Sequence, residues 1–143
     1  VSYILLAQGK VEEAEKMAIE ACDKIASTEI GAMYVDIVRP GALGRIRLAQ
    51  GRYKEAESLL QEAITQSKAV YDADPNDADA ETVCRYYIDL CNVYATQGDI
   101  KSARKALKSA EKYATYEYDR QLIKNLNICF CLIYPFWDVK YSG

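Results

Sequence analysis

Apolar residues recur every three or four positions along the chain, in blocks that are separated by polar turns containing glycine or proline. This spacing places the apolar side chains on one face of a helix, whereas a strand would need strict alternation. The pattern predicts helices at residues 1–8, 11–27, 30–50, 52–71, 77–97, 100–117 and 119–134. Pro40 falls inside the third of them, and because a proline in a helix interior costs about 3 kcal/mol, we expect a kink or a break near residues 36–41.

Three segments of the chain align on a glycine, namely Gly9, Gly51 and Gly98. An apolar residue follows each glycine after two positions and an alanine after five, then a small or apolar residue after nine and a second alanine after twelve. A glycine ends a helix at low cost because it adopts the left-handed conformation without a Cβ clash. Small residues spaced along one stripe let a neighbouring helix approach closely. The sequence therefore predicts repeated pairs of packed helices.

Further positions of the repeat precede the glycines, with Tyr87, Leu90 and Tyr94 in the third copy and Leu43-Gly44 in the second. The set resembles the tetratricopeptide repeat. The glycines stand 42 residues (9 to 51) and 47 residues (51 to 98) apart, against about 34 in the simple repeat, which is similar to the long repeats of kinesin light chains and related signalling proteins. Arg47 departs from the pattern, since the repeat usually has Tyr there.

The resemblance implies an all-α fold, a right-handed α-solenoid of about three helix hairpins in a single domain at residues 1–143. The hairpins would occupy residues 1–27, 30–71 and 77–117. The helix at 119–134 carries apolar residues at helical spacing (Leu122, Leu126, Phe130 and Ile133) and is followed by Pro135. A solenoid needs its last core surface covered, so we expect this helix to act as a cap.

Charge narrows the range of partners. The chain has 18 basic and 21 acidic side chains and a net charge of −3, which argues against a nucleic-acid or anionic-lipid ligand. A one-sided basic stripe runs through Lys101, Lys105, Lys108 and Lys112, but no aromatic residue is interleaved for base stacking. We expect this stripe to face solvent.

Other features bear on the compartment. No apolar run reaches the roughly 18–20 residues that span a bilayer. The five cysteines are an odd number without the spacing of a disulfide framework, as is typical of unpaired thiols in the cytoplasm. Because the chain opens at Val1, within an apolar segment and without Met, we expect it to be part of a longer protein.

Residues for catalysis or metal binding are scarce. The chain has no histidine, which removes Ser-His-Asp and Cys-His catalysis and the commonest metal ligand. Cys129 and Cys131 would point to different faces of a helix, and no second pair stands at zinc-site spacing. The acidic run from Asp72 to Glu81 lacks the central glycine and the final glutamate of a calcium-binding EF-hand. We predict no enzyme activity, no metal site and no cofactor.

The resemblance also implies where a partner binds, because the first helices of the pairs line the concave side of such solenoids. The corresponding positions in this chain are Tyr3, Arg45, Leu48, Arg85, Ile88, Asp89, Asn92 and Thr96. Arginine forks and amides suit the backbone and carboxylates of a peptide.

The expected function is that of a protein–protein interaction scaffold that binds a peptide or a helix in its concave groove. Two alternatives remain open at the level of the sequence. One is a regulatory or sensor domain within a larger signalling protein or transcription regulator. The other is a homo-oligomerisation unit that stacks end to end through its incomplete first helix pair and its apolar last helix.

Overall fold

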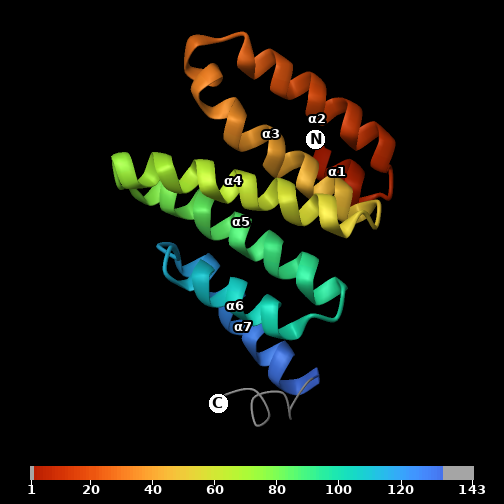
Figure 1. Ribbon diagram of the computed structural model, residues 1–143, viewed down its shortest axis with the longest axis vertical. Helices are drawn as coiled ribbons and strands as arrows, with labels where there is room; N and C mark the ends of the chain where they lie inside the picture. The colour runs from red at the N-terminus through yellow and green to blue at the C-terminus, as the bar shows by residue number, and fades with distance from the viewer. Residues whose placement is uncertain (1, 134–143) are drawn as a thin grey trace.

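The computed structural model describes residues 2–133, and the side chains of residues 4–132 within them. This part of the chain forms helices and contains no strand. The helices are α1 (Ser2–Ala7), α2 (Val11–Ala26), α3 (Glu29–Ala49), α4 (Tyr53–Ala73), α5 (Asp77–Thr96), α6 (Ile100–Glu111) and α7 (Glu117–Ile133). They follow one another along the long axis, from α1, α2 and α3 at one end to α6 and α7 at the other (Figure 1). The all-helical solenoid expected from the repeat is confirmed.

The three aligned glycines end helices α1, α3 and α5 in the same way. Gly9, Gly51 and Gly98 have φ angles of 74°, 73° and 77°, in the left-handed region where a side chain would be strained. In each turn the amide after the glycine donates to a carbonyl five residues earlier, as Arg52 N does to Arg47 O at 2.8 Å. This bond closes a Schellman motif and satisfies a carbonyl at the helix end, so the sequence repeat is a repeat of turn geometry.

Each helix packs against the next one in the chain, and α5 also contacts α3 and α7. The alanine five positions after each glycine has no exposed surface, as at Ala56 and Ala103. Close approach is most evident at Gly44, where an added Cβ would lie 2.8 Å from Leu60 Cγ. Small side chains thus allow the helices to pack tightly, as expected.

The first copy is packed less completely than the other two. Ala21 is exposed, whereas its counterparts Ala63 and Ala110 are fully buried. Helix α1 has six residues, whereas α3 has 21. At about 1.5 Å per residue, α1 is too short to lie along the second half of α2.

Arg47 makes the contact that a tyrosine makes in the next copy. Its Nη1 lies 2.7 Å from Glu15 Oε1, and only 15% of its side chain is exposed. Tyr94, which stands four residues before its glycine as Arg47 does, donates its hydroxyl to Glu57 Oε1 at 2.7 Å. Glu15 and Glu57 both lie six positions after the glycine of the preceding copy. The position therefore keeps a polar link between successive copies, made by an ion pair at Arg47 and by a hydrogen bond from a neutral hydroxyl to a carboxylate at Tyr94.

Helix α3 continues through Pro40 from Glu29 to Ala49, so the single helix expected at 30–50 is confirmed, and of the two expected disruptions, a kink or a break, the break does not occur. Proline has no amide hydrogen to donate within the helix, and the Tyr86 hydroxyl donates to the nearby Ile37 carbonyl at 3.3 Å. Gly41 leaves room for that ring, because a Cβ there would lie 2.3 Å from Tyr86 Cε1. A tyrosine of α5 thus contacts α3 one residue after Asp36, whose carbonyl has no donor from Pro40.

The predicted helix at 100–117 is too long. Helix α6 ends at Glu111, and α7 begins at Glu117, two residues earlier than expected. The Tyr113 ring packs edge-on against Tyr71, with ring centroids 5.5 Å apart, and stacks on Tyr87 at 6.1 Å. These aromatic contacts hold the chain in a turn between the two helices.

Candidate functional site

Helix α5 presents two opposite sides. Tyr87, Leu90 and Tyr94 line a depression together with residues of α4 and α6. The residues at Arg85, Asp89, Asn92 and Thr96 follow an i, i+4, i+7, i+11 spacing, so they form a stripe that points away from α4 and α6. We call these four residues the α5 stripe. Three of them are exposed, and Asp89 is half-buried.

An ion pair joins the α5 stripe to α3. Arg45 Nη2 and Nε both lie 2.6 Å from Asp89 Oδ2, and the side chains are 20% and 18% exposed. The Arg45 guanidinium also lies 5.6 Å from the centroid of the Tyr86 ring, within cation–π range. Burial raises the pKa of Asp89 above its usual range, and the charge of Arg45 opposes that rise. Because two donors of Arg45 are directed at a carboxylate of its own chain, this pair serves first to join two helices.

Arg85 has a different environment, although sequence analysis grouped it with Arg45. Its side chain is 51% exposed, and its Nη2 lies 2.6 Å from Oε1 of Glu81, one turn earlier on the same helix. An exposed pair of this kind contributes little to stability, about 0.3–0.5 kcal/mol. Arg85 can therefore exchange its partner for an incoming carboxylate at low cost.

The other predicted groove residues lie in several environments. Asn92 is exposed, and the Thr96 hydroxyl donates to its carbonyl at 2.7 Å. Leu48 is half-buried against the core, and Ile88 belongs to the core with 7% exposure, so Ile88 offers little surface. The side chain of Tyr3 lies outside the described residues.

Asp119, on α7, is buried against α5 and was not singled out from the sequence. Its side chain is 1% exposed, and neither carboxylate oxygen has a hydrogen-bond partner within residues 2–133. Burial raises the pKa of Asp119, and the nearby charge of Arg85 opposes the rise. Only the α5–α7 packing reveals this carboxylate, because an acidic residue in the first turn of a helix is usually solvated.

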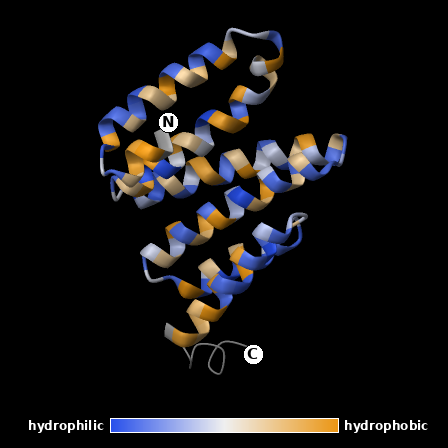
Figure 2. Ribbon diagram, turned by 180° about the vertical axis from the view of Figure 1, so that it is seen from behind, coloured by the Kyte–Doolittle hydropathy of each residue, from blue (hydrophilic) through white to orange (hydrophobic). Residues whose placement is uncertain are grey.

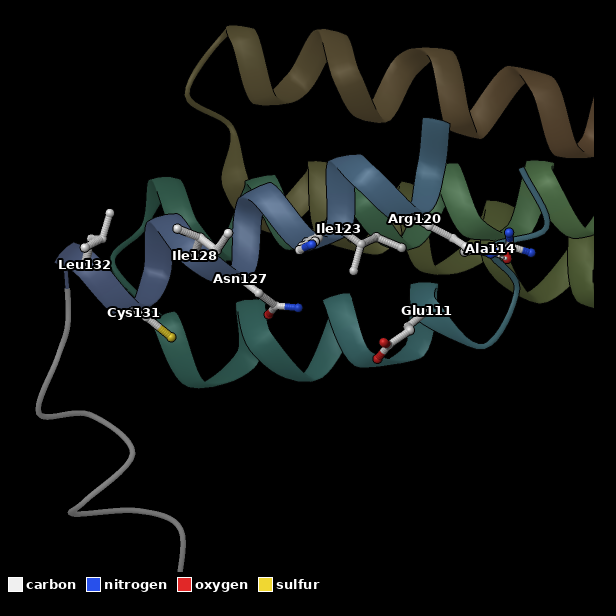
Figure 3. A pocket seen from close by; sticks show the side chains of 9 residues that line it. Glu111, Ala114, Arg120, Ile123, Asn127, Ile128, Cys131 and Leu132 are labelled. Carbon is white, nitrogen blue, oxygen red and sulfur yellow. Dashed lines mark hydrogen bonds between the residues drawn. The ribbon is translucent and has the colours of Figure 1, made fainter. Parts of the chain in front are cut away.

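A groove between α6 and α7 was also missed. It encloses about 700 Å³, and its apolar lining includes Ile123, Ile128 and Leu132 (Figure 3). The expected cap is present on the other side of α7, where Phe130 is buried and Leu122 and Leu126 are half-buried against the core. Ile133 is outside the described side chains. The i, i+4 pair of Ile128 and Leu132 could have indicated a second apolar side of this helix.

The cysteines divide into two classes. Cys22, Cys84 and Cys91 are buried, whereas Cys129 and Cys131 are exposed. Burial raises the pKa of Cys84 to about 12 and that of Cys91 to about 11, which keeps these thiols protonated and unreactive at neutral pH. In the described part of the chain, no cluster of three cysteine or acidic side chains could hold a metal ion.

Lys101, Lys105 and Lys108 of the predicted basic stripe are exposed on α6, and Lys112 is exposed just after it. Among residues 2–133, no helix is both long and apolar enough to cross a membrane.

Comparison with known proteins identifies one segment. Residues 41–77, which cover the second half of α3, the whole of α4 and the turn into α5, match the family model of the tetratricopeptide repeat. The match begins at Gly41 and includes the Gly44, Gly51 and Ala56 positions that define the helix pair. Neither a curated protein nor a solved structure matches the chain.

Proposed function

Because this chain belongs to the tetratricopeptide repeat family, whose members generally mediate protein–protein interactions, we propose that it binds a peptide or a helix of another protein along the α5 stripe. The observation that carries the proposal is the exposure of Arg85, Asn92 and Thr96 on one side of α5, beside the Arg45–Asp89 pair. This side is turned away from α4 and α6, as the partner-binding side of a solenoid is.

The chemistry of the stripe favours an extended peptide with an acidic side chain. Asn92 offers both a donor and an acceptor to a peptide backbone. Arg85 offers a fork of donors to a carboxylate, in place of its weak pair with Glu81. Arg45 and Asp89 would form the floor between them, where their mutual pairing leaves little net charge.

Binding rather than catalysis is the role we infer, since the repeat family is a non-enzymatic scaffold and the chain has no histidine. We also place this role in the cytoplasm, because all five cysteines are free thiols and such thiols persist in reducing compartments. No cofactor is needed for this function.

The test is affinity capture from the source cell with two charge-reversal variants. Arg85→Glu changes the α5 stripe, and Lys105→Glu makes the same change on exposed α6. Arg45→Glu is unsuitable, because it would set two carboxylates against each other at Asp89 and destabilise the helix packing.

We expect a partner that Lys105→Glu retains and Arg85→Glu loses, and a synthetic peptide from that partner should bind the unchanged chain in calorimetry. If both variants capture the partner equally and both are folded by circular dichroism, the α5 stripe does not bind that partner and the proposal is wrong.

A further inference from the structure

The groove between α6 and α7 has an apolar interior and an exposed apolar rim. Ile123, at its floor, is 3% exposed, whereas Ile128 and Leu132 are 48% and 76% exposed. The ribbon of the last turns of α7 is coloured mostly as hydrophobic in Figure 2.

The opposite end of the molecule has a second unpartnered apolar stripe. Ile30, Met33 and Tyr34, at i, i+3 and i+4 on the first turns of α3, are 76%, 73% and 40% exposed. We call these three residues the α3 edge.

The two ends carry opposite charge. Helix α2 has five acidic and two basic side chains, and residues 29–39 of α3 add two acidic ones, Glu29 and Asp36, and one basic one, Arg39, which pairs with Asp23 at 2.7 Å. Helices α6 and α7 together have six basic side chains and three acidic ones, and one of those three, Asp119, is buried. Two basic residues, Lys124 and Arg120, and one acidic residue, Glu111, line the α6–α7 groove itself.

We propose that this chain associates with copies of itself head to tail, with the α3 edge of one molecule seated in the α6–α7 groove of the next. The groove is apolar with a basic rim, and the edge is apolar with an acidic surround, so apolar burial and charge attraction favour the same pairing. Figure 1 places the two surfaces at opposite ends of the long axis. Such a contact is heterologous: each added copy leaves one groove and one edge free, and the assembly grows with concentration.

This proposal is independent of the proposed function, because it uses the two ends of the solenoid rather than the α5 stripe. Its test uses Leu132→Glu to inactivate the groove and Met33→Glu to inactivate the edge. Both positions are more than 70% exposed, so neither change disturbs the core. Gln66→Glu, at an exposed position on α4, is a control that adds the same charge away from both ends.

Mass is measured over a wide concentration range by sedimentation velocity. We expect the unchanged chain and Gln66→Glu to rise beyond twice the 16.1 kDa monomer mass, and each end variant alone to remain at the monomer mass. An equimolar mixture of the two end variants should form dimers and stop there, since each pair has one intact groove and one intact edge. High salt should weaken the association, because the attraction of the exposed charges is screened.

Several results would overturn the proposal. The unchanged chain could stay at the monomer mass at every concentration, as it would if its own C-terminal segment filled the groove. Either end variant alone could still dimerise, which would indicate a symmetric interface. The mixture of the two end variants could also fail to form dimers, which would show that the α6–α7 groove does not bind the α3 edge.

Discussion

Substitution of Gly41 by alanine tests whether the Pro40 region of α3 depends on Tyr86. At an open helix position, Gly→Ala raises the free energy of unfolding by about 0.5–1 kcal/mol, because alanine is the better helix former. At Gly41 the new Cβ would lie 2.3 Å from Tyr86 Cε1 and 2.6 Å from its Cζ. Carbon atoms do not approach that closely, so the ring must move.

The size of the effect follows from what the ring would lose. Tyr86 is 8% exposed, and its hydroxyl donates to the Ile37 carbonyl at 3.3 Å. Loss of that hydrogen bond costs about 1 kcal/mol, and overpacking a filled core costs about 1–3 kcal/mol. After the gain in helix propensity is subtracted, we expect Gly41→Ala to lower the free energy of unfolding by about 1–3 kcal/mol.

Urea unfolding followed by circular dichroism measures this change, with two controls. Ala42→Gly, in the same helix, should cost about 0.5–1 kcal/mol and reports helix propensity alone. Tyr86→Leu removes Cε1, Cζ and the hydroxyl, so Gly41→Ala in that background should be neutral or stabilising. The reasoning is refuted if Gly41→Ala stabilises the unchanged chain, or if it destabilises the Tyr86→Leu background equally.

Three further predictions concern other parts of the molecule. Asp119→Ala should raise the free energy of unfolding at pH 7 by about 1 kcal/mol, because an unpartnered buried group costs about 1–3 kcal/mol and the helix-dipole benefit is only about 0.3–1 kcal/mol. Burial raises the pKa of Asp119, so the folded chain holds that proton more tightly than the unfolded chain, and the ionised side chain destabilises the fold increasingly as the pH rises above 3.8. Urea unfolding at a series of pH values should show that the stability gained from Asp119→Ala disappears at low pH. A gain that is largest at low pH contradicts this. Gly51→Ala should lower the thermal midpoint and the free energy of unfolding by about 1–2 kcal/mol, because φ is 73° at Gly51. No atom lies within 4 Å of the new Cβ, so the loss comes from the backbone conformation alone, and an unchanged midpoint would mean that the turn relaxes. A maleimide reagent should label Cys129 and Cys131 in the folded chain and Cys84 only after unfolding, and mass spectrometry that finds Cys84 labelled first would contradict its burial.

Sequence alone determined the helices and their turns. The period of the apolar residues placed six of the seven helices of the described residues within about two residues at both ends, because amphipathic spacing is a local property of a helix. The three glycines identified the helix ends, because a left-handed residue is favourable only without a Cβ. Asp99, which directly follows Gly98, caps α6, and its side chain accepts from Ser102 N at 3.1 Å.

Contacts between helices required the tertiary structure. The last third of the 100–117 prediction, residues 112–117, failed because Tyr113 packs on Tyr71 and Tyr87, which lie 42 (113 − 71) and 26 (113 − 87) residues earlier. No local pattern contains that attraction. The choice between a kink and a break at Pro40 also needed the structure, in which α3 is continuous and Tyr86 of α5 donates to the Ile37 carbonyl.

For surface side chains as well, the sequence shows their positions, whereas their contacts depend on helices that are distant in the chain. Sequence positions assigned Arg45 and Arg85 to one groove, but only helix packing distinguishes the half-buried partner of Asp89 from the exposed arginine beside Glu81. Arg47 differed from the repeat in sequence, yet the structure shows that its contact with Glu15 matches that of Tyr94 with Glu57. A sequence specifies which side chains a helix carries and on which face, whereas burial, pKa and pairing depend on what a distant helix brings to that face.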